Sequence, residues 1–291
     1  MRGKTRIKRT KRRSSRRKVK KSMRGGGDLR FAVMAQFKNE KMAIEEWVAH
    51  YKWQGADEIL LLNNESSNAG GDLVKGMEHV TILDAPGKAV QRENYNNIGR
   101  PWLEKNKIDL VLIVDLDEFV YATEKGKTLK QRAVEIFSAP DRPSVVDFRW
   151  MIFGSNGFDK QPASIRKSFT KRYKDVDPMI FHVKSISFLK DIRPGGLSLH
   201  TPEINEGGKI LNSPPGIQIN HYRTQSKEFF RTVKMTRGAA NTIHNHRDLK
   251  NFEEMDKFVN DNPLEDTGLK ELVEAAEKEG LTPVTPAATD P

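Results

Sequence analysis

Short, almost wholly apolar runs alternate with amphipathic segments through the first half of this sequence. Four such runs lie at residues 29–37, 58–63, 79–85 and 108–115. They do not alternate polar with apolar residues, as a strand with one solvated face does. Continuous apolar runs of this length are typical of strands buried on both faces. The pattern therefore indicates a sheet that is covered on both sides.

The segments between these runs have helical periodicity. From Ile44 to Tyr51 apolar residues recur at i, i+3, i+4 and i+7, which places them on one helical face, and Gly55 ends that segment. Residues 89–106 are predicted to form another helix. Alternation of strand, helix and strand predicts an α/β fold, here a single Rossmann-like domain with a mostly parallel central sheet.

The composition changes at both ends of the chain. Residues 1–27 carry fourteen Lys and Arg and no Asp or Glu, so of the net charge of +11 the remainder holds 11 − 14 = −3. Such a segment cannot bury enough apolar surface to fold, and we expect a disordered basic arm that contacts polyanions nonspecifically. We divide the chain into the arm at 1–27, a domain at 28–250 with halves at 28–127 and 128–250, a helical segment at 251–277 and a flexible tail at 278–291.

Some classes of protein are excluded by what the sequence lacks. There is no cysteine, so there are no disulfides and no thiolate metal sites. No run approaches 18 consecutive apolar residues, and no apolar segment follows the basic N-terminus. We therefore expect a soluble protein without a transmembrane segment, in the cytoplasm or, through its basic arm, in the nucleus.

Two aspartates end the apolar run at 108–115, in the motif VDLDEF. Residues i and i+2 of a strand point to the same side, so Asp115 and Asp117 should converge while Leu116 faces the core. At about 4 Å two carboxylates repel by roughly 4 kcal/mol at an effective dielectric constant of 20. A divalent cation would offset this repulsion, and oxygen ligands favour Mg²⁺ or Mn²⁺. The alternative is a pair of solvated aspartates in a turn.

Two classes of enzyme place D-x-D after an apolar strand. In haloacid-dehalogenase-like phosphatases the first Asp is the nucleophile, which here would be Asp115, but the motif normally stands near the start of the domain. Nucleotide-sugar glycosyltransferases with the GT-A fold have D-x-D after a complete nucleotide-binding half, as in this chain. A catalytically silent sugar-binding or scaffold protein of the same fold is a further alternative.

A series of short motifs follows in a fixed order along the chain: FKNE (37–40), EEW (45–47), QGADEILLLNNESS (54–67), VDLDEF (114–119), WMIFGSNG (150–157), VKSI (183–186), His200 and NHYRTQSKEFF (220–230). Together they resemble glycosyltransferase family 92 and its family 2-like bacterial relatives. The resemblance implies a metal-dependent GT-A enzyme. Such an enzyme would move a sugar from a nucleoside diphosphate sugar, with UDP favoured, to a glycan acceptor and invert the anomeric centre.

The resemblance and the positions of the strand ends suggest a set of donor contacts. Nucleotide-sugar binding is expected at Lys38, Asn39, Glu40, Asn63, Asn64, Ser66, Arg92, Asp115, Leu116 and Asp117. Helix N-termini and the carboxyl ends of strands suit anionic and polar ligands. As structural alternatives, Asn39 is a helix N-cap, residues 63–66 form an Asx turn, and Arg92 is a surface residue.

The remaining candidates concern the metal, the acceptor and the base. Asp115, Asp117 and His221 are expected to bind Mn²⁺ or Mg²⁺, with a buried structural role as the alternative for His221. Contacts to the acceptor are expected at Trp150, Phe153, Gly154 and Ser155, although core packing explains the two aromatic residues equally well. Inverting transfer needs a carboxylate that deprotonates the acceptor hydroxyl, and the candidates are Asp159 and Asp191.

Overall fold

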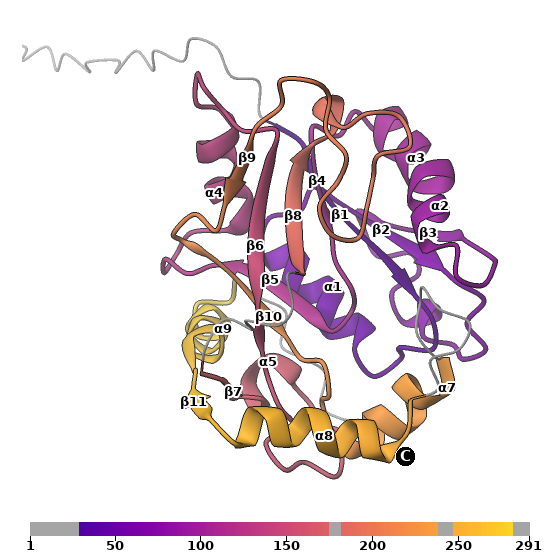
Figure 1. Cartoon of the computed structure of the whole chain (residues 1–291), viewed down its shortest axis with the longest axis vertical. Coiled ribbons are helices and arrows are strands. Elements are labelled where there is room, and N and C mark those ends of the chain that lie inside the picture. The colour runs from indigo at the N-terminus through magenta and orange to yellow at the C-terminus, as the bar shows by residue number, and fades with distance from the viewer. Residues whose placement is uncertain (1–28, 175–181, 238–246, 282–291) are drawn as a thin grey trace, which may run out of the picture.

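The computed structural model describes residues 29–174, 182–237 and 247–281 (Figure 1). The first half of the sheet is parallel, in the order β3-β2-β1-β4. Its strands are β1 (Phe31–Phe37), β2 (Glu58–Asn63), β3 (Val80–Asp84) and β4 (Leu110–Ile113). Its helices are α1 (Ile44–Trp53), η1 (Gly71–Leu73), α2 (Gln91–Asn94), the π-helical η2 (Tyr95–Gly99) and α3 (Arg100–Lys105).

The second half continues the same sheet with mixed directions, in the order β4-β8-β6-β10-β5. The strands are β5 (Glu118–Ala122), β6 (Val145–Ile152), β8 (Val183–Phe188), β9 (Ile210–Asn212) and β10 (Ile217–His221). Strand β8 is antiparallel to both β4 and β6, β9 and β10 are parallel to β6, and β5 is antiparallel to β10. The parallel order therefore ends between β4 and β8.

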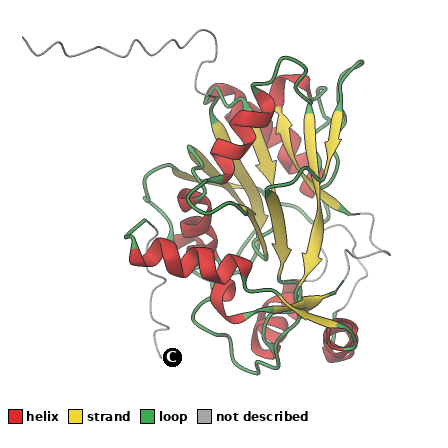
Figure 2. Cartoon of the chain, turned by 90° about the vertical axis from the view of Figure 1, so that its left-hand side faces the viewer, coloured by secondary structure: helices red, strands yellow, loops and turns green. Residues whose placement is uncertain are grey.

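The other elements cover the second half. They are α4 (Leu129–Phe137), α5 (Ile165–Ser168), β7 (Lys171–Tyr173), η3 (Leu189–Asp191), α6 (Lys227–Phe229), the π-helical η4 (Phe230–Lys234), α7 (Met235–Arg237), α8 (Leu249–Asn260), β11 (Pro263–Glu265) and α9 (Gly268–Lys278). Strands β7 and β11 form a separate antiparallel pair. Figure 2 shows the twisted sheet from the side, with helices packed against it.

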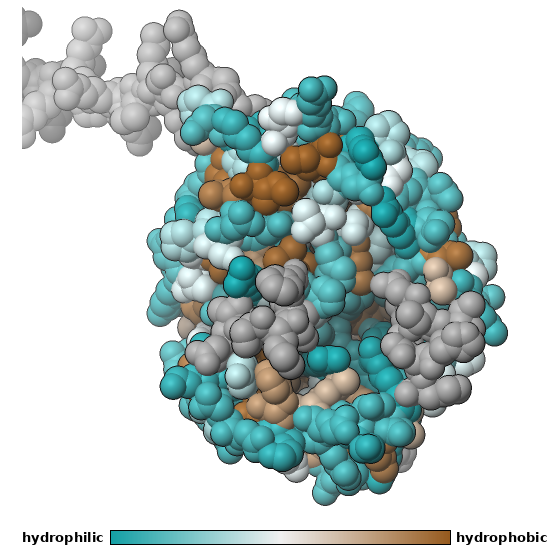
Figure 3. All heavy atoms as spheres, in the orientation of Figure 1, coloured by the Kyte–Doolittle hydropathy of each residue, from teal (hydrophilic) through white to brown (hydrophobic). Residues whose placement is uncertain are grey.

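Apolar residues fill both faces of the sheet. Alternate residues of β1 face opposite ways, so Phe31 packs in the same cluster as Trp47 of α1, whereas Met34 packs with Tyr95 and Leu103 of η2 and α3. Full burial of one such side chain contributes about 1.5–3 kcal/mol. Figure 3 shows a mostly hydrophilic outer face with apolar residues confined to patches. The predicted α/β single domain with a mostly parallel central sheet is confirmed.

The first helix ends as the sequence predicts. Gly55 has a φ of +85°, a conformation that L side chains rarely adopt. The amide of the next residue, Ala56, turns back to the carbonyl of Tyr51 at 3.0 Å. The turn directs the chain into β2, whose residue Glu58 pairs with Ala32 of β1.

Two features of the second half were not predicted. Residues Glu118–Ala122 form strand β5 directly after the D-x-D motif, where no sequence pattern predicted a separate strand. The boundary drawn after residue 250 falls inside α8, which packs on the loop after β6. The predicted disorder of the arm at 1–27 and the last ten residues of the tail lie outside the described residues. Within residues 29–174, 182–237 and 247–281, no helix has the length and apolarity needed to cross a membrane.

Candidate functional site

The D-x-D motif forms the turn that joins β4 to β5, at the point where the parallel order of the sheet ends. Open α/β sheets bind ligands beyond the carboxyl ends of their strands, where the strand order reverses, and here the order reverses between β1 and β4. The expectation that Asp115 and Asp117 belong to a strand is wrong, because β4 ends at Ile113 and the chain turns. Leu116 is buried in the core as predicted, with 1% of its surface exposed.

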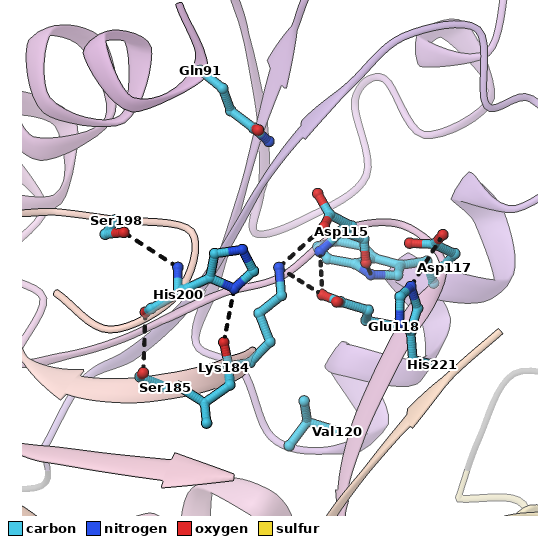
Figure 4. A network of polar contacts seen from close by, with 12 residues as sticks. Gln91, Asp115, Asp117, Glu118, Val120, Lys184, Ser185, Ser198, His200 and His221 are labelled. Carbon is cyan, nitrogen blue, oxygen red and sulfur yellow. Dashed lines mark hydrogen bonds and ion pairs between the residues drawn. The ribbon is translucent and has the colours of Figure 1, made fainter. Parts of the chain in front are cut away.

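Asp115 is held by a lysine from a neighbouring strand. The Nζ of Lys184, in β8, lies 3.0 Å from Asp115 Oδ2 and 3.0 Å from Glu118 Oε2 (Figure 4). Glu118 Oε2 also accepts a hydrogen bond of 2.8 Å from the backbone N–H of Asp115. Lys184 and Glu118 are both fully buried. Burial alone would lower the pKa of Lys184, but the charges of Asp115 and Glu118 outweigh this effect and raise it.

Glu118 is a third acidic residue in the motif. Burial raises the pKa of Glu118 to about 8. The charges of Asp115 and Asp117 add to this effect, and burial and these charges together outweigh the opposing charge of Lys184. Its second oxygen, Oε1, is buried and has no hydrogen-bond partner among the described residues. The carboxyl group of Glu118 thus fixes the turn through one oxygen and leaves the other unsatisfied.

Asp117 is held by a different lysine. Lys234, in the π-helical η4, donates a hydrogen bond to Asp117 Oδ2, and His221 Nε2 of β10 lies 3.6 Å from the same oxygen. Burial raises the pKa of Asp117, but the charge of Lys234 and the ring of His221 outweigh burial and hold it well below its usual range. Burial also lowers the pKa values of His221 and Lys234, although Asp117 opposes both shifts.

The predicted three-ligand metal site is not formed as a set. In Figure 4 the side chain of Asp115 is turned toward Lys184, whereas that of Asp117 is turned toward His221. Only Asp117 and His221 approach each other, and each aspartate already has an ammonium group beside it. In the part of the chain that the structure describes, no cluster of three His, Asp or Glu side chains could hold a metal ion. Metal binding therefore stays a prediction.

Trp150 lies among three histidines. Its ring centroid is 4.3 Å from that of His221, 5.5 Å from His182 and 5.8 Å from His200. The rings of His182 and His200 stack at 4.5 Å. The indole Nε1 is buried without a hydrogen-bond partner among residues that the structure describes. Trp150 thus lies beside the D-x-D turn, and its role toward an acceptor stays a prediction.

The predicted donor residues at the ends of β1 and β2 are engaged with one another. Asn39 has a φ of +58° and does not cap a helix; its Oδ1 accepts a hydrogen bond of 2.7 Å from Ser67 N, and its own N–H donates to Ser66 Oγ. Asn63 Oδ1 accepts from Ser66 N, three residues further on, so residues 63–66 form a side-chain-bonded loop as the structural alternative expects, although an Asx turn would bond the residue two positions on. Asn64 Nδ2 donates to the carbonyls of Ala85 and Gly87. These contacts shape the loops, and binding of a nucleotide there is still to be tested.

Three further predicted donor residues lie elsewhere around this edge. Lys38 is half-buried at the end of β1. Glu40 is buried and paired with Arg237 of α7. Arg92 is about half exposed, with 53% of its side-chain surface accessible, and pairs with Glu203. Arg92 therefore lies at the surface, as the structural alternative expects, and links α2 to the loop after β8.

Three of the four predicted acceptor residues do not face an open site. Phe153 is buried in the core, with its ring 4.9 Å from that of Tyr222. Ser155 N donates a hydrogen bond of 2.6 Å to Asp256 Oδ1 of α8, and a Cβ on Gly154 would lie 3.1 Å from that oxygen. The expectation of direct acceptor contacts at Phe153, Gly154 and Ser155 is wrong, because α8 packs over this segment.

The two candidate bases lie far apart. Strand β8 is antiparallel to β4 with Phe188 opposite Leu110, so Asp191 lies beyond the amino end of β4 and Asp115 beyond its carboxyl end. Asp191 is bound to Arg142 at 2.6 Å and to Ser144 at 3.0 Å. The prediction of Asp191 as the base is therefore wrong. Asp159 is exposed in the loop after β6, and its role stays a prediction.

Sequence reasoning missed several residues of the site. Lys184 and Lys234 were not singled out, although Lys184 lies in the motif VKSI of the resemblance and each lysine has apolar neighbours, in VKSISF and FFRTVKM, where a buried charge requires a partner. Gln91 was missed as well. It has 3% of its surface exposed, its Nε2 bonds the Tyr95 hydroxyl at 2.6 Å, and its Oε1 has no partner within the described ranges. The sequence carries no local signal for Gln91.

No protein-family model matches the sequence, and no curated protein matches it. The resemblance to glycosyltransferase family 92 therefore stays a prediction.

Several solved structures are similar to the chain at low identity. TarS 1–349 of S. aureus in complex with UDP-GlcNAc is 10% identical, with 80% of this chain and 72% of that chain covered and a TM-score of 0.41. HddC from Yersinia pseudotuberculosis is 9% identical, with 66% and 93% covered and a TM-score of 0.40. A putative glucose-1-phosphate thymidylyltransferase from Bacillus anthracis is 9% identical, with 87% and 95% covered and a TM-score of 0.31. Likenesses of this size are too distant to assign a function.

Proposed function

We propose that the chain is a glycosyltransferase that moves a sugar from a nucleoside diphosphate sugar, with UDP favoured, to a glycan acceptor with inversion. The observation that carries the proposal is a group of buried polar atoms around the D-x-D turn without hydrogen-bond partners in the described part of the chain. They are Gln91 Oε1, Glu118 Oε1, Trp150 Nε1 and His221 Nδ1. An unsatisfied buried polar atom costs about 1–3 kcal/mol, so such a group at one strand edge favours a polar ligand there.

The charges of the site suit a leaving diphosphate. Lys184 uses two of its three N–H donors on Asp115 and Glu118, and these two contacts hold its ammonium group at the strand edge. A fixed positive charge placed where negative charge develops stabilises the transition state without reorganisation. In this proposal Lys184 and Lys234 supply that charge, and Asp159 is the remaining candidate for the base.

Metal dependence is a separate part of the proposal. Asp117 Oδ2 and His221 Nε2, 3.6 Å apart, would hold Mn²⁺ or Mg²⁺. The ion would have to displace the ammonium of Lys234 from Asp117, because that group bonds the same oxygen. A divalent ion offsets charge on the diphosphate as the lysines do.

The proposal is tested by donor binding followed by turnover. The full chain is titrated with UDP-glucose, GDP-mannose, UDP and GDP, with Mn²⁺ and with EDTA, and the melting temperature is recorded. A ligand at 100 times its Kd stabilises the folded state by about 2.7 kcal/mol. We expect at least one sugar nucleotide to stabilise the chain and to be slowly hydrolysed to the nucleoside diphosphate and free sugar.

Two variants and two further measurements distinguish a glycosyltransferase from a phosphatase and from a silent binding protein. Asp115→Asn should abolish hydrolysis, whereas the matched change Asp191→Asn, at the opposite end of the sheet, should not. Release of inorganic phosphate with an acyl phosphate on Asp115 would instead identify a phosphatase. Sugar-nucleotide binding without any turnover, in the presence of varied glycan acceptors, would identify a silent binding protein.

A further inference from the structure

The amide of Gln91 is fixed in place by the elements around it. Gln91 begins α2, and its Nε2 donates a hydrogen bond of 2.6 Å to the hydroxyl of Tyr95, one turn further on. Tyr95 is fully buried between the sheet and α3. The neighbouring Asn94 ties the same helix to the sheet through Gln36 Oε1, at 2.9 Å, and the carbonyl of Ala85, at 3.2 Å. Because one end of the Gln91 amide is bound, the direction of its free oxygen is set.

The helix that carries Gln91 lies beside the loop that carries His200. Asn96 of η2 exchanges two hydrogen bonds with the backbone of Leu197, at 2.9 and 3.0 Å. Arg92 reaches the carbonyl of Gly195 in the same loop. In Figure 4 the amide of Gln91 points into the space between Asp115 and His200.

The charge of Asp115 acts on groups of both elements. After burial, the charge of Asp115 is the next cause that raises the pKa of Tyr95, the residue that holds Gln91. Asp115 also acts on the pKa of His200, which burial and the charge of Lys184 lower to about 4. The ring of His200 is therefore neutral at pH 7.

The tautomer of His200 follows from its hydrogen bond. Its Nδ1 lies 3.0 Å from the carbonyl oxygen of Val183, which can only accept, so Nδ1 carries the proton and Nε2 has a free lone pair. The ring is also held by stacking on His182. The backbone of His200 is held by Ser185, whose hydroxyl donates to its carbonyl at 3.1 Å.

Three groups that can accept hydrogen bonds thus lie around one region: the amide of Gln91, whose Oε1 has no partner among the described residues, His200 through Nε2, and the carboxylate of Asp115. An ionised diphosphate has only acceptor oxygens, so it would find no hydrogen-bond donor in these three groups. A sugar ring carries several hydroxyls, and each can donate one hydrogen bond to such an acceptor. These three acceptors match the hydroxyls of a polyhydroxylated ring, whereas the ammonium of Lys184, 3.0 Å from Asp115, is the donor that would serve the diphosphate.

We infer that Gln91 and His200 select the donor by accepting hydrogen bonds from hydroxyl groups of the sugar that is transferred. The inference rests on the proposed function, since it assigns residues to the sugar part of that donor. A site built to bond a hydroxyl discriminates strongly against ligands that lack it, because its own buried acceptor is then left unpaired. The nucleoside diphosphate part of the donor owes nothing to these two residues.

The test compares sugar nucleotides with their parent nucleotides. Isothermal titration measures the binding of UDP-glucose, GDP-mannose, UDP and GDP to the full chain and to Gln91→Met, which has a similar length and no polar atom. We expect about tenfold weaker binding of the preferred sugar nucleotide, and affinity for its parent nucleotide within about twofold of the unmodified chain. His200→Phe, which keeps the stacked ring and removes the acceptor, should behave in the same way.

Each other outcome has a definite meaning. Equal losses for the sugar nucleotide and the nucleotide, or no loss in either variant, would overturn the inference. Gln218→Met, which removes an amide from the far end of β10, is the matched control and should bind both ligands normally. Melting curves check that each variant folds, and His200→Phe keeps the test open if Gln91→Met does not. If the unmodified chain binds none of the four ligands, the proposed function itself fails.

Discussion

Lys234 and Asp117 form a buried ion pair although 117 positions separate them in the sequence. Their side chains expose 3% and 4% of their surface. The pair ties the π-helical η4 to the turn between β4 and β5, so the loop that carries the D-x-D motif is fixed from the far end of the chain. The charge balance of this pair leads to the first two predictions.

Replacing Asp117 by Asn should destabilise the protein. The change leaves the ammonium of Lys234 buried without a counter-charge, and breaking a buried pair in this way costs about 3–5 kcal/mol. Urea unfolding followed by tryptophan fluorescence measures the loss. The double variant Asp117→Asn with Lys234→Met should regain most of the stability, because no charge is then unpaired. A single variant as stable as the unmodified chain would show that the pair is absent in solution.

Lys234 and a divalent ion should compete for Asp117. In Lys234→Met the carboxylate is buried and unpaired, so Mn²⁺ bound by Asp117 and His221 would relieve that cost. We expect Mn²⁺ to raise the melting temperature of Lys234→Met more than that of the unmodified chain, by several degrees for about 1–2 kcal/mol. Adding His221→Phe should remove the difference. Equal shifts in all three proteins would contradict metal binding at this position.

Glu118 should make stability fall as the pH rises. Its pKa is raised to about 8 in the folded protein, mainly by burial, whereas an unfolded Glu has a pKa of about 4.3. Between these values the folded state binds more protons than the unfolded state, so the free energy of unfolding decreases with increasing pH. From pH 5.5 to 8.5 the unmodified chain should lose about 1–3 kcal/mol relative to Glu118→Gln. Glu104→Gln, at an exposed site on α3, is the control, and a pH-independent difference for Glu118→Gln would refute the prediction.

Deleting residues 1–27 should leave donor binding unchanged. The deletion removes fourteen positive charges from a remainder with a net charge of −3, and every side chain assigned to the site lies after residue 28. Binding to heparin or to nucleic acid should be lost, and in the full chain this binding should weaken steeply with salt. Filter binding at several salt concentrations measures the effect. Loss of sugar-nucleotide binding in a folded truncated protein would place the arm at the active site.

Hydrophobic periodicity was enough to predict much of the fold. The runs at 29–37, 58–63 and 79–85 became β1, β2 and β3, and the helical pattern from Ile44 became α1. A strand buried on both faces must be apolar throughout, and a helix with one buried face must have apolar residues every three to four positions. Both patterns can therefore be recognised in the local sequence. The position of Asp115 at a carboxyl strand end follows from the same patterns.

The partners of the D-x-D motif were decided only by the tertiary structure. Lys184 and Lys234 contact the turn from a strand and a helix that are distant in sequence, and Gln91 points toward the same region (Figure 4). No local sequence pattern predicts contacts of this kind, because they form only when the chain folds. The same limit explains the errors at Asp191 and Ser155. The direction of β8 places Asp191 at the opposite end of β4, and α8 packs over Ser155. Periodicity shows which side of an element is buried. Strand direction and packing depend on the whole chain, because many different partners distant in sequence can cover the same apolar face.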